Sequence, residues 1–302
     1  MPATLVLVLA LLGISFAGPL VRLSHAHPLA IAIWRLGFSL VIIAVALVAT
    51  GSWRQWRRLD RSRTIVAVAA GAMLAIHFWT WNASIAFTTV AASVVLVNTQ
   101  PAMVALLSAG WLHEPPTRRQ WMGIAIAMAG AFVVALPDMA SATHATTGRA
   151  LFGDLLALAG AAAAACYFVA GRKLRTILDL WPYVAVVYGT CFVVLIGFAA
   201  MVHAPVMHQP PRELAIFAAL AVGPMLLGHT GLNWALKYLP AYVVNLTLLG
   251  EPVGATLLAA ILPGIREVPG IVTLAGGALI LAGIYVTARA ARAALAVPAA
   301  PA

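Results

Sequence analysis

This chain of 302 residues is 63% hydrophobic and only 9% charged, and its mean hydropathy is +1.00. A soluble domain of this length needs much more polar surface, so the composition excludes one. The net charge of +10 comes from basic residues in short segments between apolar runs. Basic residues in such loops set membrane topology, so we expect no nucleic-acid partner.

Apolar runs of about 20 residues, long enough to cross a hydrocarbon core of about 30 Å, recur along the whole chain. The first is expected to be a retained helix, because no basic residue precedes it as in a signal peptide. The sequence therefore predicts an all-α polytopic membrane protein with ten transmembrane helices. These are expected at residues 3–22, 28–50, 64–86, 89–111, 119–136, 151–171, 181–202, 213–236, 241–262 and 269–288.

The two halves of the chain resemble each other. Asn82 and Asn233 lie as far apart as Pro101 and Pro252, and a slightly longer spacing relates the Gly-x6-Gly pair at Gly123 to the later pair at Gly276 and Gly283. A polar linker at 137–150 separates a first five-helix repeat (1–136) from a second (151–288), followed by a tail at 289–302. Because five is odd, the second repeat is predicted to be inverted, as in many transporters.

The distribution of Lys and Arg residues predicts the orientation. Thirteen lie in segments on the side of the N-terminus: Arg54, Arg57, Arg58, Arg61, Arg63, Arg118, Arg119, Arg172, Lys173, Arg175, Lys237, Arg289 and Arg292. Four lie on the other side: Arg22, Arg149, Arg212 and Arg266. Excess positive charge stays in the cytoplasm, so we expect both termini to be cytoplasmic and the linker to be periplasmic.

Glu251 is the sharpest candidate for a functional residue. It lies near the middle of the ninth predicted helix, directly before Pro252. Proline breaks helical hydrogen bonding, so Pro101 and Pro252 are predicted bends or hinges. A carboxylate at such a break could hold a substrate ammonium or take up a proton, or it could be a protonated group bonded to a neighbouring helix.

Other polar residues within the apolar runs are candidates for a substrate site between the repeats. His77 and Trp81 share one helix face, as do His229 and Asn233. Each histidine could carry a proton or simply bond a carbonyl. The remaining candidate lining residues are Asn82, Asn98, Tyr167 and Asn245.

Arg35, in the second predicted helix, has three interpretations: it could bind a substrate carboxylate, extend to the interface or pair with an acid. Cys166 and Cys191 lie in apolar runs without CxxC spacing, and no HExxH motif or other metal-ligand spacing occurs, so no metal site is expected. No GxxxxGK[ST] or GxSxG motif occurs either, so we expect no ATP or other cofactor and no catalytic residues.

The paired features Gln100-Pro101 and Glu251-Pro252, with Glu114 and Glu267 each followed by Gly-x6-Gly, resemble the drug/metabolite transporter superfamily. The resemblance is to its EamA-type branch, and most of all to the YddG-type exporters of aromatic and other amino acids. It covers essentially the whole chain. It implies a ten-helix inner-membrane exporter whose cavity is lined by helices 1, 3, 4, 6, 8 and 9, with helices 5 and 10 packed outside.

The leading functional prediction is a secondary transporter that exports aromatic or large neutral amino acids and similar small metabolites by alternating access, as a monomer. Its transport is either coupled to protons or passive. One alternative is an exporter of drugs or quaternary cations, since a single membrane acid among aromatic rings suits a cation. A membrane-embedded enzyme is the other, although only one mid-membrane carboxylate, Glu251, is present.

Overall fold

The computed structural model describes residues 2–84, 86–88, 90–141, 147–261 and 269–296, and throughout these ranges the regular structure is helical. Ten candidate spans occur within them, each overlapping one predicted helix. In chain order the elements are α1 (Ala3–Ser15), α2 (Ala17–Leu23), α3 (Pro28–Ala49), η1 (Ser52–Arg58), α4 (Arg61–Ser84), α5 (Val90–Val97), α6 (Gln100–Leu107), η2 (Ser108–Leu112), α7 (Arg118–Ser141), α8 (Thr147–Arg175), α9 (Leu180–Met201), α10 (Pro211–Leu220), η3 (Ala221–His229), α11 (Thr230–Ala235), α12 (Ala241–Thr247), η4 (Leu248–Gly250), α13 (Glu251–Ile261) and α14 (Ile271–Ala296).

The fourth and ninth spans are broken, each just before its proline. The fourth changes from α5 to α6 at Asn98 and Thr99, and the ninth changes from α12 to α13 through the short 3₁₀ segment η4. Pro101 and Pro252 are the second residues of the restarted helices. Proline lacks the N–H that would bond the carbonyl four residues earlier, and it fits the first turn of a helix. The predicted breaks are confirmed, and their role as hinges stays a prediction.

The eighth span is also irregular. Between α10 and α11 it widens into the π-helical segment η3, which contains Pro224 and ends at His229. A shorter π-helical segment, η2, ends the fourth span. π-helical turns are uncommon and often occur at functional sites, and no pattern in the sequence predicts them.

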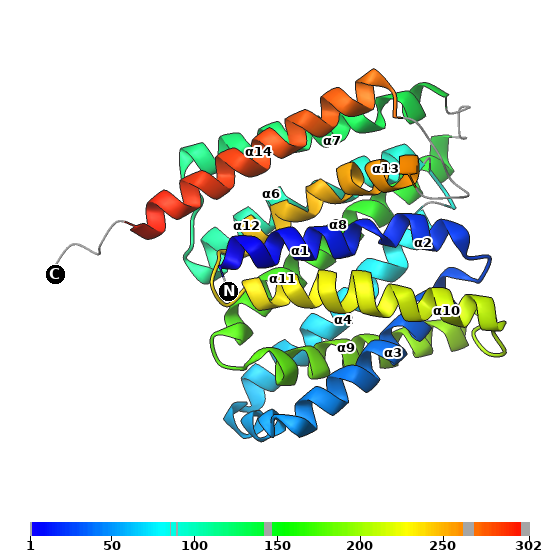
Figure 1. Ribbon diagram of the computed structural model, residues 1–302, viewed down its shortest axis with the longest axis vertical. Coiled ribbons are helices and arrows are strands. Elements are labelled where there is room, and N and C mark those ends of the chain that lie inside the picture. Colours follow the sequence, from blue (N-terminus) through cyan, green and yellow to red (C-terminus); the bar gives the residue numbers. More distant parts are fainter. Residues whose placement is uncertain (1, 85, 89, 142–146, 262–268, 297–302) are drawn as a thin grey trace.

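Contacts between the spans follow a two-fold rule. The first span packs on the eighth (α1 on η3 and α11), and the third packs on the sixth (α4 on α8). Exchanging each span of the first half with the corresponding span of the second half turns the contact of α1 with α13 into the contact of α8 with α5 and α6. The same exchange leaves the pairs α3–α9 and α7–α14 unchanged. Figure 1 shows α7 and α14 side by side along one edge of the bundle. This pairing is the one expected of two inverted five-helix repeats.

Both helices at the middle of the chain extend into the predicted linker. α7 continues through Pro137 to Ser141, and α8 begins at Thr147, so helical backbone projects past the predicted ends of the spans. Residues 142–146 of the linker, Glu267 and the last part of the tail lie outside the described residues. The repeat and linker boundaries stay predictions.

Glycines join α7 to α14. A Cβ atom added at Gly283 would lie 2.5 Å from the Gly123 carbonyl oxygen, and one added at Gly130 would lie 2.7 Å from the Gly276 carbonyl oxygen. The two backbones therefore touch where no side chain fits, as small residues allow in membranes. The fifth and tenth spans therefore pair through the glycines of the two Gly-x6-Gly motifs.

Replacing Gly283 by leucine should separate α7 from α14. We expect the free energy of unfolding to fall by about 1–3 kcal/mol, the usual cost of overpacking. The measurement is the melting temperature of the purified protein in detergent. Gly197→Leu is the matched control, because a Cβ there meets nothing within 4 Å. Equal melting temperatures for the two variants would contradict the glycine contact.

Candidate functional site

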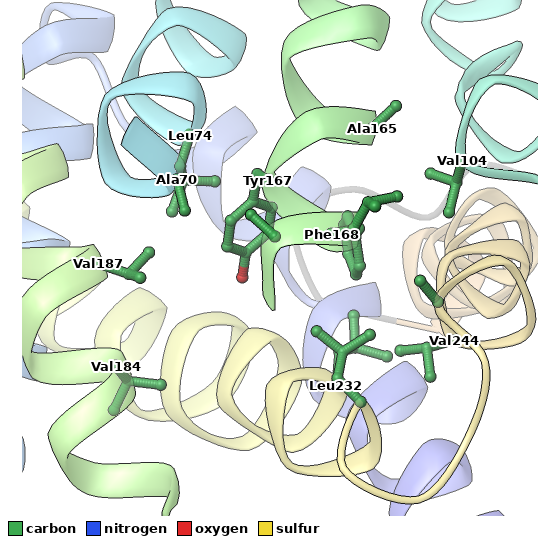
Figure 2. Packing of buried hydrophobic residues seen from close by; sticks show 14 of the residues in the cluster. Ala70, Leu74, Val104, Ala165, Tyr167, Phe168, Val184, Val187, Leu232 and Val244 are labelled. Carbon is green, nitrogen blue, oxygen red and sulfur yellow. The ribbon is translucent and has the colours of Figure 1, made fainter. Parts of the chain in front are cut away.

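The interior of the bundle is packed solidly in one half. Every residue of α12 is buried, and so is nearly all of the second half of α8. Figure 2 shows this core, where Tyr167 and Phe168 lie among Val104, Leu232 and Val244. This core lies in the half of the bundle near η1 and the C-terminal ends of α8 and α11. We call this half the basic end, because the sequence predicts that thirteen basic residues lie there.

The other half of the same spans is looser. Residues 251–256 of α13 and most of residues 92–99 are only partly buried, although they continue the buried spans. Arg35, His77, His229 and Glu251 lie at the junction of the two halves, each surrounded by protein but still partly accessible. Because accessible surface at this depth is expected where a side chain borders an internal space, these four residues are the candidate lining of a substrate site.

Arg35 occupies the centre of this site. Its guanidinium carbon lies 4.5 Å from the centre of the Phe78 ring. It interacts electrostatically with Glu251, His77 and His229, which belong to three other spans. No ion pair within 4.0 Å joins Arg35 to any described residue. The site therefore holds a cation and an acid that attract each other without direct pairing.

The histidines border the same space. The Nδ1 atom of His77 lies 3.0 Å from the Gly160 carbonyl oxygen, so this histidine does bond a carbonyl across helices. Its ring stacks on Trp81 with centres 6.5 Å apart, and the His229 ring meets the edge or face of Phe78 at 6.1 Å. The Nε1 atom of Trp81 is buried without a hydrogen-bond partner in the described part of the chain. These rings form an aromatic wall beside Arg35.

The three other asparagines differ in their surroundings. Asn82 donates to the Phe78 carbonyl oxygen at 2.6 Å within its own helix, while Asn98 lies at the break between α5 and α6. Asn245 is fully buried in α12, and neither polar atom of its amide has a partner among the described residues. Its position in the packed half separates it from Glu251 in the looser half, and the substrate role of all three stays a prediction.

Tyr167 and Asn233 are engaged with each other. The Tyr167 hydroxyl donates to Asn233 Oδ1 at 2.8 Å, and Asn233 Nδ2 donates to the Tyr188 hydroxyl oxygen at 3.0 Å. Tyr188 lies 3.2 Å from the Thr230 hydroxyl, and the Asn233 carbonyl accepts from Arg175. This network closes the bundle below the site. Contact of Tyr167 and Asn233 with substrate stays a prediction, and it requires the network to open.

Polar contacts connect the segments at the basic end, and those of Glu114 with Arg172 and of Asp179 with Gln55 join the two halves of the chain. Glu114 pairs with Arg172 at 2.8 Å, and Asp179 pairs with Lys237 at 3.1 Å and accepts from Gln55 at 2.7 Å. The Gln55 hydrogen bond, with Lys237, lowers the pKa of Asp179 below its ordinary value of 3.8. At the opposite end, the buried Glu213 of α10 accepts from Ser24, next to α2.

Asp179→Asn should weaken closure of the basic end. A carboxyl whose pKa is lower in the folded state stabilises that state above its unfolded pKa, and the contribution disappears as pH falls through the folded pKa. We expect a loss of at most about 1 kcal/mol near neutral pH, because the pair is exposed. The difference in melting temperature from the natural protein should begin to shrink as the pH falls to about 3.8 and should vanish below the lower pKa of folded Asp179. A difference that persists unchanged in acid would contradict the ion pair.

The Tyr167–Asn233 bond can be measured with a double-mutant cycle. Asn233→Leu leaves the Tyr167 hydroxyl without its hydrogen-bond acceptor, and Tyr167→Phe leaves the Asn233 oxygen unbonded. Each should lower the free energy of unfolding by about 1–3 kcal/mol. Because the double variant removes both partners, its loss should be smaller than the sum of the two single losses. Strict additivity would show that the two groups do not interact.

The family resemblance does not include the second helix among those expected to line the cavity, so Arg35 fits that expectation less well than the other candidates. The structure places Arg35 at the centre of the site. The available signal was chemical: an arginine within an apolar span is costly and is usually functional. This chemical signal is stronger evidence for a functional role of Arg35 than the set of helices that the family resemblance predicts to line the cavity.

Known proteins resemble this chain over 67% to 97% of its length. An uncharacterized transporter of Archaeoglobus fulgidus is 25% identical over 92% of this chain and 94% of its own. The uncharacterized transporter YetK of Bacillus subtilis is 26% identical over 67% of this chain and 60% of its own. A crystal structure of a protein with 21% identity shares the fold, with a TM-score of 0.80 over 97% of this chain and 98% of that one.

The family comparison agrees with the ten spans and with the paired halves of the sequence. The EamA-like transporter family matches residues 1–136 and again residues 151–289. The resemblance to the drug/metabolite transporter superfamily is thereby confirmed. This chain is a membrane protein that belongs to the EamA-like transporter family.

Proposed function

We propose that the protein is a secondary transporter that exports amino acids, chiefly aromatic or large neutral ones, and similar small metabolites across the bacterial inner membrane. The position of Glu251 carries this proposal. It begins α13 at a break in the ninth span, within the partly accessible interior. No hydrogen bond or ion pair to a described residue satisfies its carboxylate, which is therefore free to bind a substrate ammonium.

The backbone around Glu251 is irregular. Glu251 lies where the 3₁₀ segment η4 passes into α13, and its backbone N–H donates to the Leu248 carbonyl oxygen. An irregular segment at membrane depth is tolerated where protein or a water-filled cavity covers it. A substrate site at the centre of the bundle fits this position.

The neighbouring rings suit a large apolar side chain. Phe78, His77 and Trp81 lie on one stretch of α4, and His229 approaches Phe78 from η3. Aromatic side chains bind other rings by offset or edge contacts and bind aliphatic chains by burying apolar area. These rings therefore favour amino acids with aromatic or branched side chains, rather than small polar ones, as substrates.

The transport cycle follows from the uneven packing. With the basic end in the cytoplasm, the packed half closes the cytoplasmic path, and the accessible interior lies toward the periplasm. Alternating access would open the Tyr167–Asn233 network while the other half closes, with bending at Pro101 and Pro252. The two inverted repeats supply both sides of the cavity, so a monomer suffices. Glu251, His77 and His229 are the groups that could carry a proton.

Uptake into proteoliposomes tests the proposal. Labelled phenylalanine and leucine should enter above the level of empty liposomes, and the response to a pH gradient reports coupling to protons. Glu251→Gln should lower amino-acid uptake about tenfold or more, since an ammonium loses a charge-assisted hydrogen bond worth about 1.5–3 kcal/mol. Tyr285→Phe, on the exposed face of α14, is the control and should transport normally.

Two results would reject amino-acid export. One is no amino-acid uptake by protein with a normal melting temperature. The other is uptake of a quaternary cation that Glu251→Gln abolishes, which would assign the chain to drug or cation export instead.

A further inference from the structure

We propose that Arg35 binds the α-carboxylate of the substrate, and that Arg35 and Glu251 together make the site selective for zwitterions over amines. This inference rests on the proposed transport of amino acids and specifies how the site recognises them. It assigns the second span, through α3, a part in substrate selection.

The position of Arg35 excludes a purely interfacial role. It is the eighth residue of α3, so it lies about 10 Å along the helix from Pro28, at a rise of 1.5 Å per residue. Its guanidinium lies over Phe78 of α4 and does not extend along the bundle surface. A cation held at this depth without a counter-ion is expensive, so its retention needs a partner that the described residues do not provide.

The guanidinium has hydrogen-bonding capacity to spare. Its Nε atom is enclosed and has no partner within the described chain. The terminal nitrogens of Arg35 form no hydrogen bond to another described residue. Unlike Nε, they are not enclosed. Phe78 covers one face of the planar group, which leaves the N–H groups at its edge available. An edge of two parallel N–H donors matches the two oxygens of a carboxylate.

Glu251 is close enough to attract Arg35 but is not bonded to it. The two interact electrostatically across the site, yet their charged atoms lie outside the 4.0 Å limit of an ion pair. Because the two side chains do not pair directly, the Arg35 fork and the Glu251 carboxylate each keep hydrogen-bonding capacity for a molecule that presents a carboxylate to Arg35 and an ammonium to Glu251. An α-amino acid carries both groups on one carbon.

Arg35 itself adds to the discrimination, because its positive charge repels a ligand that carries only positive charge. His77 and His229 lie within electrostatic reach of Arg35, and this repulsion does not require either of them to be protonated. An amine without a carboxylate would meet this repulsion and leave Arg35 unsatisfied. Loss of one partner of a buried charged group costs more than the bond itself is worth.

The first experiment varies the ligand and leaves the protein intact. Phenylalanine, phenethylamine and phenylalaninamide share one side chain and ammonium, but only phenylalanine has a carboxylate. Each is used to inhibit uptake of labelled phenylalanine into proteoliposomes. We expect phenethylamine and phenylalaninamide to inhibit about 10- to 100-fold more weakly than phenylalanine, from the usual strength of a charge-assisted bond.

The second experiment varies Arg35. Arg35→Gln should weaken phenylalanine inhibition about 10- to 100-fold and leave phenethylamine unchanged or stronger. Arg35→Lys should recover part of the affinity, because it keeps the charge but loses the planar fork. Arg57→Gln, an exposed substitution in η1, is the matched control. The double variant Arg35→Gln with Glu251→Gln should not restore uptake, whereas it would do so if Arg35 only neutralised Glu251.

The outcomes separate the two proposals. No uptake of amino acids by folded protein overturns the proposed function itself. Phenylalanine uptake that phenethylamine inhibits as strongly as phenylalanine leaves that function intact and overturns the role of Arg35. Recovery of uptake in the double variant also overturns it. The comparison of ligands on the natural protein decides the question even if every Arg35 variant fails to fold.

Discussion

The lack of water in the bilayer core governs this structure, because each peptide N–H and C=O there must find its partner within the protein. Ten helices meet that requirement along most of the chain. At the interruptions the N–H groups of Asn98 and Thr99, and that of Glu251 after η4, still bond carbonyl oxygens within their own spans. Glu251 is the first residue of α13, directly after the 3₁₀ segment. The ninth span therefore presents its carboxylate at an irregular point of the backbone.

Scarcity of charge makes the interior charges informative. In a chain with 9% charged residues, Arg35 and Glu251 come from spans far apart in the sequence and meet at one depth. Each would be costly alone, and together they remain incompletely satisfied. The cluster of Tyr167, Tyr188, Thr230 and Asn233 is polar, but each of its members has a hydrogen-bond partner. Arg35, in contrast, keeps unused donors, which sets it apart from that cluster.

Much of the fold could be predicted from the sequence, because length and hydropathy define spans and proline defines breaks. The ten spans and the interruptions before Pro101 and Pro252 followed from those signals. The sequence could not predict whether the side chain of each polar residue points into the interior space or bonds a neighbouring helix. Uniformly apolar helices have no polar stripe, so Asn233, which is bonded in the core, was a candidate lining residue alongside Glu251, which is partly accessible. The central position of Arg35 depends on contacts of α3 with other spans, and the widening of η3 left no sequence signal.

The glycine contacts between α7 and α14 constrain how the halves can move. Each of these helices is the last of its repeat, and their backbones touch at Gly123 and Gly283 and again at Gly130 and Gly276. Sliding one helix along the other by a single residue, about 1.5 Å, would drive neighbouring side chains into the opposing backbone. Rotation about the line of contact disturbs it least. The pair therefore acts as a pivot at one edge of the bundle, and displacement grows with distance from it, toward the spans that carry Arg35 and Glu251.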